Sequence, residues 1–220
     1  MFGLNPSFPP RHLVPLVEEV AELLKGRNET VSVAETAAGG IISAALLSTP
    51  GASRIYKGGL TLYTLPSRVQ FAGWTEEDIR SYAGPTLGVV SKIAENVRGK
   101  LDSTYTICES GTAGPTGGST RNRTPGYVAL AVSTPEGTFT READTGSADR
   151  AENMVNFAVE ALKLLIDVIK GEWDVKASGR EGQAVNWNLP DGLAVKTSVP
   201  QLINQILDTS GSFLDTRACG

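Results

Sequence analysis

The chain has 220 residues, of which 40% are hydrophobic and 20% charged, and its formal net charge is −4. These values fit one ordinary domain with a normal hydrophobic core and a short appendage. They exclude a dedicated nucleic-acid surface, which needs clustered lysine and arginine, and no apolar run reaches the roughly 18 residues of a membrane span.

The first half of the chain alternates helices and strands. Apolar residues at helical spacing follow Pro15, which suits the first turn of a helix. Thr75 with Asp78 three residues later has the capping-box pattern. The expected elements are helices over 15–27 and 39–48, strands over 30–35 and 60–63, and short helices over 67–72 and 76–82.

The second half ends in a hairpin and a long helix. Thr86 and Asp149 each precede an amphipathic run and are expected to cap it. The expected elements are a helix over 87–100, strands over 104–109, 127–132 and 138–143, and a helix over 150–170. This order predicts an α/β fold, a three-layer α/β/α sandwich with a mixed sheet, over residues 11–171. Residues 172–220 are rich in Gly, Asn, Ser and Asp and are expected to form a weakly ordered or appended tail.

Cysteine and histidine are scarce. Cys108 and Cys219 do not make a disulfide framework, and the N-terminus lacks the regions of a signal peptide, so we expect a cytoplasmic protein. The single histidine, His12, lies in or before the first expected helix. Because histidine-dependent hydrolysis and histidine-rich metal sites need a histidine at the site, any hydrolytic chemistry here must use another base, and we expect no metal.

Two glycine-rich loops follow strands and are expected to meet, because sites in such sheets lie at the carboxyl ends of strands. In the first loop, Thr36 follows Glu35 and is either a nucleophile or a helix cap. The second loop suits an oxyanion or a phosphate, and Arg150, Arg121 and Arg123 are candidate phosphate ligands. The other candidate binding residues of the loops are Ala38, Gly39, Gly40, Ser110, Gly111, Thr112, Ala113, Gly114, Pro115 and Gly118.

These motifs together resemble one family over residues 31–171. The A-E-T-A-A-G-G segment (34–40) is similar to the A-E-S-C-T-G-G motif of the CinA (competence/damage-inducible) C-terminal domain family, the nicotinamide mononucleotide deamidases. Three later segments match the family in order and spacing, namely P-G-A-S (50–53), S-G-T-A-G-P-T-G-G (110–118) and P-G-Y-V (125–128). The sequence of the first motif resembles that of the fungal branch of this family.

The resemblance implies an α/β/α sandwich that dimerises and hydrolyses the nicotinamide carboxamide to the acid and ammonia, without a metal or cofactor. It implies a serine nucleophile, a position held here by Thr36, and a lysine base, a position held here by Arg68. The segment G-L-T-L-Y-T-L-P-S-R (59–68) resembles the family's G-x-x-T-Y-S-N-x-x-K motif, with a one-residue difference in spacing, and it retains the tyrosine of that motif as Tyr63. A guanidinium keeps its proton at physiological pH and cannot act as a general base, so Glu35 or Tyr63 is the candidate substitute.

Three interpretations therefore stay open. The first is an amidohydrolase acting on a nicotinamide mononucleotide-like substrate, with Thr36 attacking and Arg68 steadying a phosphate or the tetrahedral anion. The second is a protein that binds a pyridine nucleotide without turning it over. The third is hydrolysis of a different small amide. In each case the partner is a small molecule, with no nucleic acid and no membrane, and a homodimer is expected.

Overall fold

The structure is a computed structural model that describes residues 8–173. Its elements follow in the order α1 (Val14–Arg27), β1 (Val31–Glu35), α2 (Ile41–Leu47), η1 (Ala52–Arg54), β2 (Tyr56–Thr61), α3 (Leu65–Ala72), α4 (Glu76–Ser81), α5 (Leu87–Leu101), β3 (Tyr105–Gly111), η2 (Arg121–Arg123), β4 (Tyr127–Thr134), β5 (Gly137–Asp144) and α6 (Arg150–Lys170). The alternation of helices and strands and the closing hairpin follow the prediction from the sequence.

The strands form one mixed sheet in the order β2-β1-β3-β4-β5. β1 pairs in parallel with both β2 and β3, whereas β3 with β4 and β4 with β5 are antiparallel. Glu35 at the end of β1 lies beside Thr61 at the end of β2. The carboxyl ends of the three parallel strands therefore share one edge of the sheet, where both glycine-rich loops begin.

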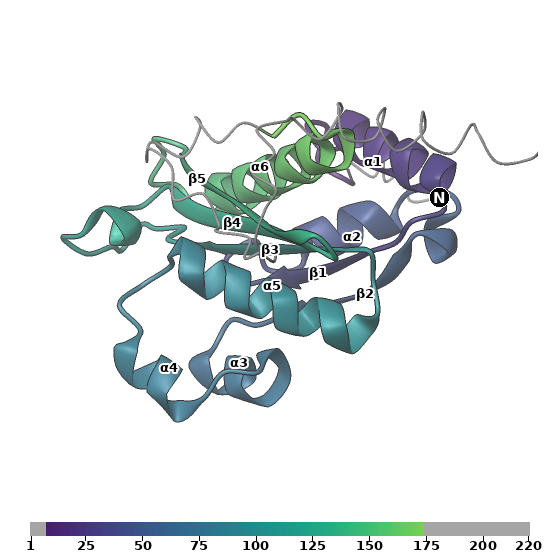
Figure 1. Cartoon of the computed structure of the whole chain (residues 1–220). Coiled ribbons are helices and arrows are strands. Elements are labelled where there is room, and N and C mark those ends of the chain that lie inside the picture. Colours follow the sequence, from purple (N-terminus) through teal and green to yellow (C-terminus); the bar gives the residue numbers. More distant parts are fainter. Residues whose placement is uncertain (1–7, 174–220) are drawn as a thin grey trace, which may run out of the picture. The chain divides into compact units, whose positions relative to one another are not determined.

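Helices cover both faces of this sheet, as Figure 1 shows for α1, α2 and α6 on one side and α5 on the other, with α3 beyond α5. Val31 and Val33 of β1 point into the core beneath α1, α2 and α6, while Ala34, the next residue, faces the core beneath α5. Burial of a large apolar side chain such as Phe157 or Leu24 stabilises the fold by about 1.5–3 kcal/mol each. The predicted three-layer α/β/α sandwich is confirmed.

Local capping signals fix several helix starts. The Thr75 side chain accepts from the Asp78 main-chain N–H, and the Asp78 carboxylate accepts from the Thr75 main-chain N–H, which makes the predicted capping box of α4. Thr86 caps α5, and Asp149 caps α6. Each cap satisfies main-chain donors that the first turn of a helix leaves without partners.

Several element boundaries differ from the prediction, and the differences at β2 and α2 have a physical reason. β2 covers Tyr56–Thr61 rather than 60–63, because an edge strand interrupted by Gly58 and Gly59 lacks a run of apolar residues. A Cβ on Gly59 would lie 2.4 Å from the Ser43 hydroxyl, so glycine lets β2 lie close to α2. α2 begins at Ile41 rather than at 39 because the two preceding glycines have positive φ angles.

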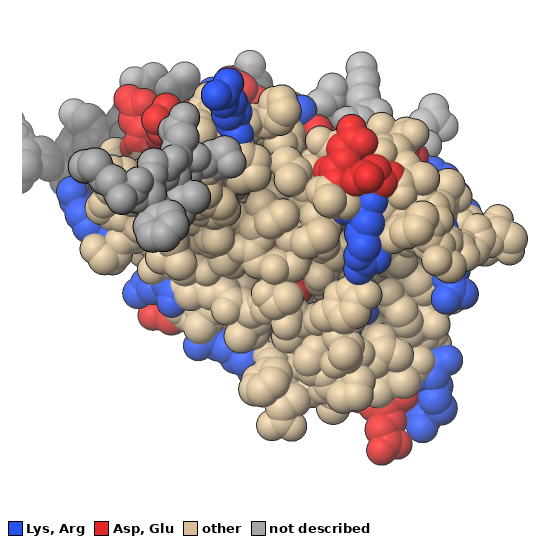
Figure 2. All heavy atoms as spheres, turned by 180° about the vertical axis from the view of Figure 1, so that it is seen from behind, with Lys and Arg blue, Asp and Glu red and all other residues tan. Residues whose placement is uncertain are grey.

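Charged side chains are mixed in sign on the surface opposite to that of Figure 1. Figure 2 shows blue and red residues around the margins of this face and mostly uncharged residues between them. Within residues 8–173 no helix is both long enough and apolar enough to cross a membrane. The predicted tail, apart from residues 172 and 173, lies outside the described residues, and the domain boundaries stay a prediction.

Candidate functional site

The two loops meet at the carboxyl ends of β1 and β3. The Thr36 hydroxyl donates a hydrogen bond to the Ser110 hydroxyl, with 3.2 Å between the two oxygens. Thr36 is 4% exposed and Ser110 is 1% exposed, so the pair is buried where the two loops meet. No hydrogen bond among the described residues joins the Thr36 hydroxyl to an ionisable side chain.

Glu35 stabilises the start of α2. Its carboxylate accepts from the main-chain N–H groups of Gly40, Ile42 and Ser43 and from the Ser43 hydroxyl, at 2.7–3.0 Å. Four donors occupy its two oxygens, and the helix dipole favours negative charge at this position. The geometry thus gives Glu35 a capping role, and its candidate role as a proton acceptor stays a prediction.

Glu109 is a site residue that the sequence reasoning missed. Its Oε2 atom accepts from the main-chain N–H of Thr36 at 3.1 Å and of Ala38 at 2.9 Å, while Oε1 has no hydrogen-bond partner within the described chain. Burial raises the pKa of Glu109 to about 7, the charge of Glu35 adds to this rise, and the main-chain hydrogen bonds oppose it. The sequence feature that could have revealed Glu109 is a carboxylate at the end of an apolar strand, just before a glycine-rich loop.

Arg68 does not point into the site in the way its motif position suggests. Its side chain is 4% exposed, and Nε donates to the Leu62 carbonyl oxygen at 3.3 Å. The guanidinium carbon lies 4.9 Å from the ring centre of Trp74 and 5.0 Å from that of Tyr82, which are cation–π distances. The guanidinium of Arg68 therefore packs against both aromatic rings, whose centres are 5.5 Å apart, and Arg68 makes no hydrogen bond to Thr36 in the part of the chain described.

Arg150, at the first turn of α6, joins two predicted site segments. Its Nη2 atom donates to the hydroxyl of Tyr63 at 3.1 Å, and its Nη1 atom donates to the Gly114 carbonyl oxygen at 3.0 Å. Tyr63 is 61% exposed, so its ring forms an outer wall of the site. Arg150 therefore links the second loop to Tyr63, and its role as a phosphate ligand stays a prediction.

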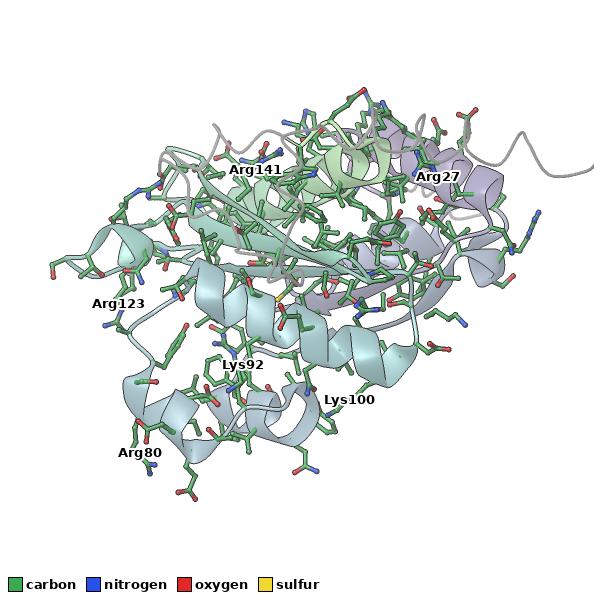
Figure 3. The ribbon with its side chains drawn as sticks, viewed as in Figure 1. Arg27, Arg80, Lys92, Lys100, Arg123 and Arg141 are labelled. Carbon is green, nitrogen blue, oxygen red and sulfur yellow. The ribbon has the colours of Figure 1, made fainter. Side chains whose placement is uncertain are left out.

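A cavity of roughly 310 Å³ opens above the second loop. Two arginines and two tyrosines line it, and no carboxylate does. Its lining residues are Ala37, Tyr63, Tyr82, Gly84, Pro85, Gly111, Thr112, Ala113, Gly114, Thr116, Gly117, Arg123 and Arg150. Figure 3 shows Arg123 near the connection between α4 and α5, in agreement with its close approach to Gly84.

Some predicted residues lie near this cavity without lining it. Thr36 is adjacent in sequence to Ala37, a lining residue. The other predicted residues outside the lining are Glu35, Ala38, Gly39, Gly40, Arg68, Ser110, Pro115 and Gly118. The first loop therefore reaches the cavity at a single residue, and the second loop forms most of its wall.

Close packing explains several glycines that the sequence analysis assigned to ligand approach. A Cβ on Gly111 would lie 2.5 Å from the Phe157 ring, and one on Gly114 would lie 2.7 Å from the Ala148 carbonyl oxygen. A Cβ on Gly39 would lie 2.9 Å from the end of the Met154 side chain. These glycines let both loops lie against α6 and the segment that precedes it.

Asn153 is a second residue that was missed. It is fully buried on α6, and its side-chain amide donates to the carbonyl oxygens of Ala113 at 2.9 Å and Ser147 at 2.8 Å. It also accepts from the Thr145 hydroxyl. The sequence feature that could have revealed Asn153 is an amide side chain on the apolar face of the last helix, four residues before Phe157.

Residues 8–173 contain no group of three or more His, Cys, Asp or Glu side chains that is suited to hold a metal ion. The ionisable groups closest to the loops are the two buried carboxylates of β1 and β3 and the arginines already described. The site therefore offers hydroxyls, main-chain groups, aromatic rings and cations.

Comparisons with known proteins place this geometry in context. The model of the CinA C-terminal domain matches residues 14–169. A CinA-like protein of Acidobacterium capsulatum is 35% identical over 151 residues, which is 68% of this chain and 36% of that protein. A CinA-like protein of Prochlorococcus marinus is 35% identical over 144 residues, 66% of this chain and 33% of that protein. The chain thus spans about a third of the length of the curated relatives that it matches.

Solved structures agree with the fold. The competence/damage-inducible protein CihA of Agrobacterium tumefaciens superposes with a TM-score of 0.68 at 24% identity, covering 73% of this chain and 97% of that one. The competence damage-inducible protein A of Klebsiella pneumoniae gives a TM-score of 0.68 at 21% identity, covering 74% and 99%. At these identities the likeness shows the fold alone, and the resemblance to a fungal branch stays a prediction.

Proposed function

The chain belongs to the CinA C-terminal domain family, and from this membership we propose its function. We propose that it is an amidohydrolase acting on the carboxamide of a pyridine mononucleotide. The observation that carries the proposal is the hydrogen bond between Thr36 and Ser110, which are next in the chain to Ala37 and Gly111, two lining residues of a cavity that two arginines also line. A hydroxyl at the end of a strand, next to a loop of main-chain polar groups, is an arrangement suited to acyl transfer.

The lining of the cavity supports an anionic, aromatic ligand. Arg150 and Arg123 provide positive charge, and guanidinium groups bind phosphate with paired N–H donors. Tyr63 and Tyr82 offer ring faces against which a pyridine ring stacks. Since no lining residue carries negative charge, a phosphate in the cavity meets no repulsion from its walls.

In the proposed reaction, the Thr36 oxygen attacks the carboxamide carbon and its proton passes to an acceptor. The carbon–nitrogen bond then breaks, the nitrogen takes up a proton, and ammonia leaves an ester on Thr36. Water hydrolyses that ester to the carboxylic acid and restores the hydroxyl. Residues 111–114 line the cavity, and in this proposal their polar groups lie near the reacting carbonyl.

Binding of a pyridine nucleotide without turnover is the second candidate, and Arg68 favours it. This residue holds the position of the family's lysine base, but its guanidinium packs against the rings of Trp74 and Tyr82, and a guanidinium cannot act as a general base. The Thr36 hydroxyl donates to another hydroxyl rather than to a base. A protein that kept the cavity and lost the proton acceptor would show this arrangement.

Two measurements on the full chain separate the candidates. Calorimetric titration with nicotinamide mononucleotide reports binding, and an ammonia assay on the same samples reports hydrolysis. Binding together with ammonia release supports the amidohydrolase, whereas binding without release supports the second candidate. Absence of both, with ammonia released from another small amide, would indicate the third interpretation.

A double variant tests whether the proton acceptor limits the rate. Thr36→Ser together with Arg68→Lys restores the family's residues at both positions. We expect faster ammonia release than from the wild type if the chain lacks only the base. An unchanged rate would show that the cavity itself has diverged. The expected homodimer is checked by the solution mass of the same samples, and a cytoplasmic location remains part of the proposal.

A further inference from the structure

We propose that Glu109 is a positioning residue that holds Thr36 in place by tying the first loop to the base of the second. The expected effect of Glu109 on turnover rests on the proposed function. The contact between Glu109 and the first loop does not depend on it. The proposal assigns a role to Glu109, which is not one of the motif residues considered for catalysis.

The contacts of Glu109 join segments that are distant in sequence. One carboxylate oxygen accepts from the main-chain N–H groups of Thr36 and Ala38, which lie 73 and 71 residues away. The adjacent residue on β3, Ser110, accepts from the Thr36 hydroxyl. Consecutive residues of β3 therefore hold both the main chain and the side chain of Thr36.

The position is unfavourable for a carboxylate. Glu109 is fully buried, its Oε1 atom has no hydrogen-bond partner among residues 8–173, and Glu35 on the neighbouring strand is also a buried acid. Burial of an ionised group with an unsatisfied oxygen costs free energy. Glu109 lowers stability in this way and contacts the loop that carries the candidate nucleophile. Such a residue is expected at a functional site rather than in an ordinary core.

The charge of Glu109 determines how strongly it holds the loop. Hydrogen bonds to an ionised acceptor are roughly twice as strong as those to a neutral one. The ionisable side chain whose charge acts on this carboxyl is Glu35 on β1. The neighbouring Cys108 has its own pKa raised by burial and by Glu109. α2 carries no ionisable side chain, and the buried face of α6 contains none. Loss of the Glu109 proton should therefore tighten the turn at Thr36.

The first test needs no ligand. In the ¹⁵N-labelled full chain, the amide resonances of Thr36 and Ala38 should shift with a common midpoint near the Glu109 pKa of about 7. The same resonances should not titrate in this range in Glu109→Gln. Resonances that stay fixed between acidic and alkaline pH in the wild type would overturn the inference, whether or not the protein hydrolyses an amide.

The second test uses turnover of nicotinamide mononucleotide. In Glu109→Gln we expect kcat at alkaline pH to fall by about 10- to 100-fold, as for a misplaced reacting group, with KM nearly unchanged because Glu109 does not line the cavity. Glu109→Asp keeps the charge but shortens the reach, so it should also lose kcat while keeping a pH-dependent rate. A Glu109→Gln protein that folds and keeps the wild-type kcat would contradict the positioning role. A wild type without turnover would contradict only the proposed function.

Discussion

Arg150 donates a hydrogen bond to the hydroxyl of Tyr63, 87 residues earlier in the chain, and to the Gly114 carbonyl oxygen in the second loop. Its planar guanidinium makes both contacts at once, which the ammonium of lysine does not reproduce. We predict that Arg150→Lys weakens binding of nicotinamide mononucleotide by about 10-fold or more, the value of one charge-assisted hydrogen bond. Calorimetric titration measures this change.

Arg121 provides the matched control for that prediction. It lies near the same loop but pairs with Glu142 and Asp144 on β5, and it does not line the cavity. Arg121→Lys should leave the affinity unchanged within about twofold, since exposed ion pairs contribute little. Equal losses of affinity in both variants would show that Arg150 has no special role in binding.

Asn153 should be a determinant of stability as well as of loop position. Asn153→Ala leaves the carbonyl oxygens of Ala113 and Ser147 buried without their donor. We predict that the free energy of unfolding falls by about 2–6 kcal/mol, from about 1–3 kcal/mol for each unsatisfied group. Urea denaturation measures the change, and Asn156→Ala on the same helix should cost less than about 1 kcal/mol. Similar losses in both variants would contradict this role.

Arg68 is expected to contribute to stability through its stacking. Lysine at this position keeps the charge but loses the planar contact with Trp74 and Tyr82 and the Nε donor to Leu62. Arg68→Lys should therefore lower the free energy of unfolding by about 1–2 kcal/mol. Arg80→Lys, at an exposed pair with Glu77, should change it by less than about 0.5 kcal/mol. The account of Arg68 fails if its variant is as stable as the wild type.

The pH dependence of stability should report Glu109. Its pKa in the folded chain is about 7, above the ordinary value of 4.5, so folding favours the protonated form. Its contribution to stability is therefore greatest below pH 4.5 and declines as the pH rises through 7, by on the order of 3 kcal/mol. Denaturation at a series of pH values measures this decline, and Glu109→Gln should remove most of it. An identical pH profile in the variant would contradict the assignment.

Local sequence signals predicted most of the fold. Thr75 with Asp78, and Thr86 and Asp149, cap their helices as expected because each cap depends on residues within three positions. β2 was placed incorrectly because an edge strand containing Gly58 and Gly59 shows no apolar alternation. Its position is fixed instead by pairing with β1, which no short window of sequence reveals.

The site was predictable only in part. The contact between Thr36 and Ser110 was predictable, because each of the two loops follows a parallel strand. The stacking of Arg68 could not be inferred, because Tyr82 belongs to a different segment and the motif position indicated a base. Glu109 was missed because its two donors lie more than 70 residues away in the chain. Contacts of this range depend on the packing of the whole sheet.

The central claim is that the Thr36 hydroxyl is the nucleophile of an amidohydrolase. Thr36→Val keeps the branched shape of the side chain and removes only the hydroxyl, while Ser110→Ala removes its hydrogen-bond partner and serves as the control. The most direct measurement is ammonia released from nicotinamide mononucleotide by the wild type and both variants. We predict release by the wild type, reduced release by Ser110→Ala and background release by Thr36→Val. Equal release by the wild type and Thr36→Val would contradict the claim.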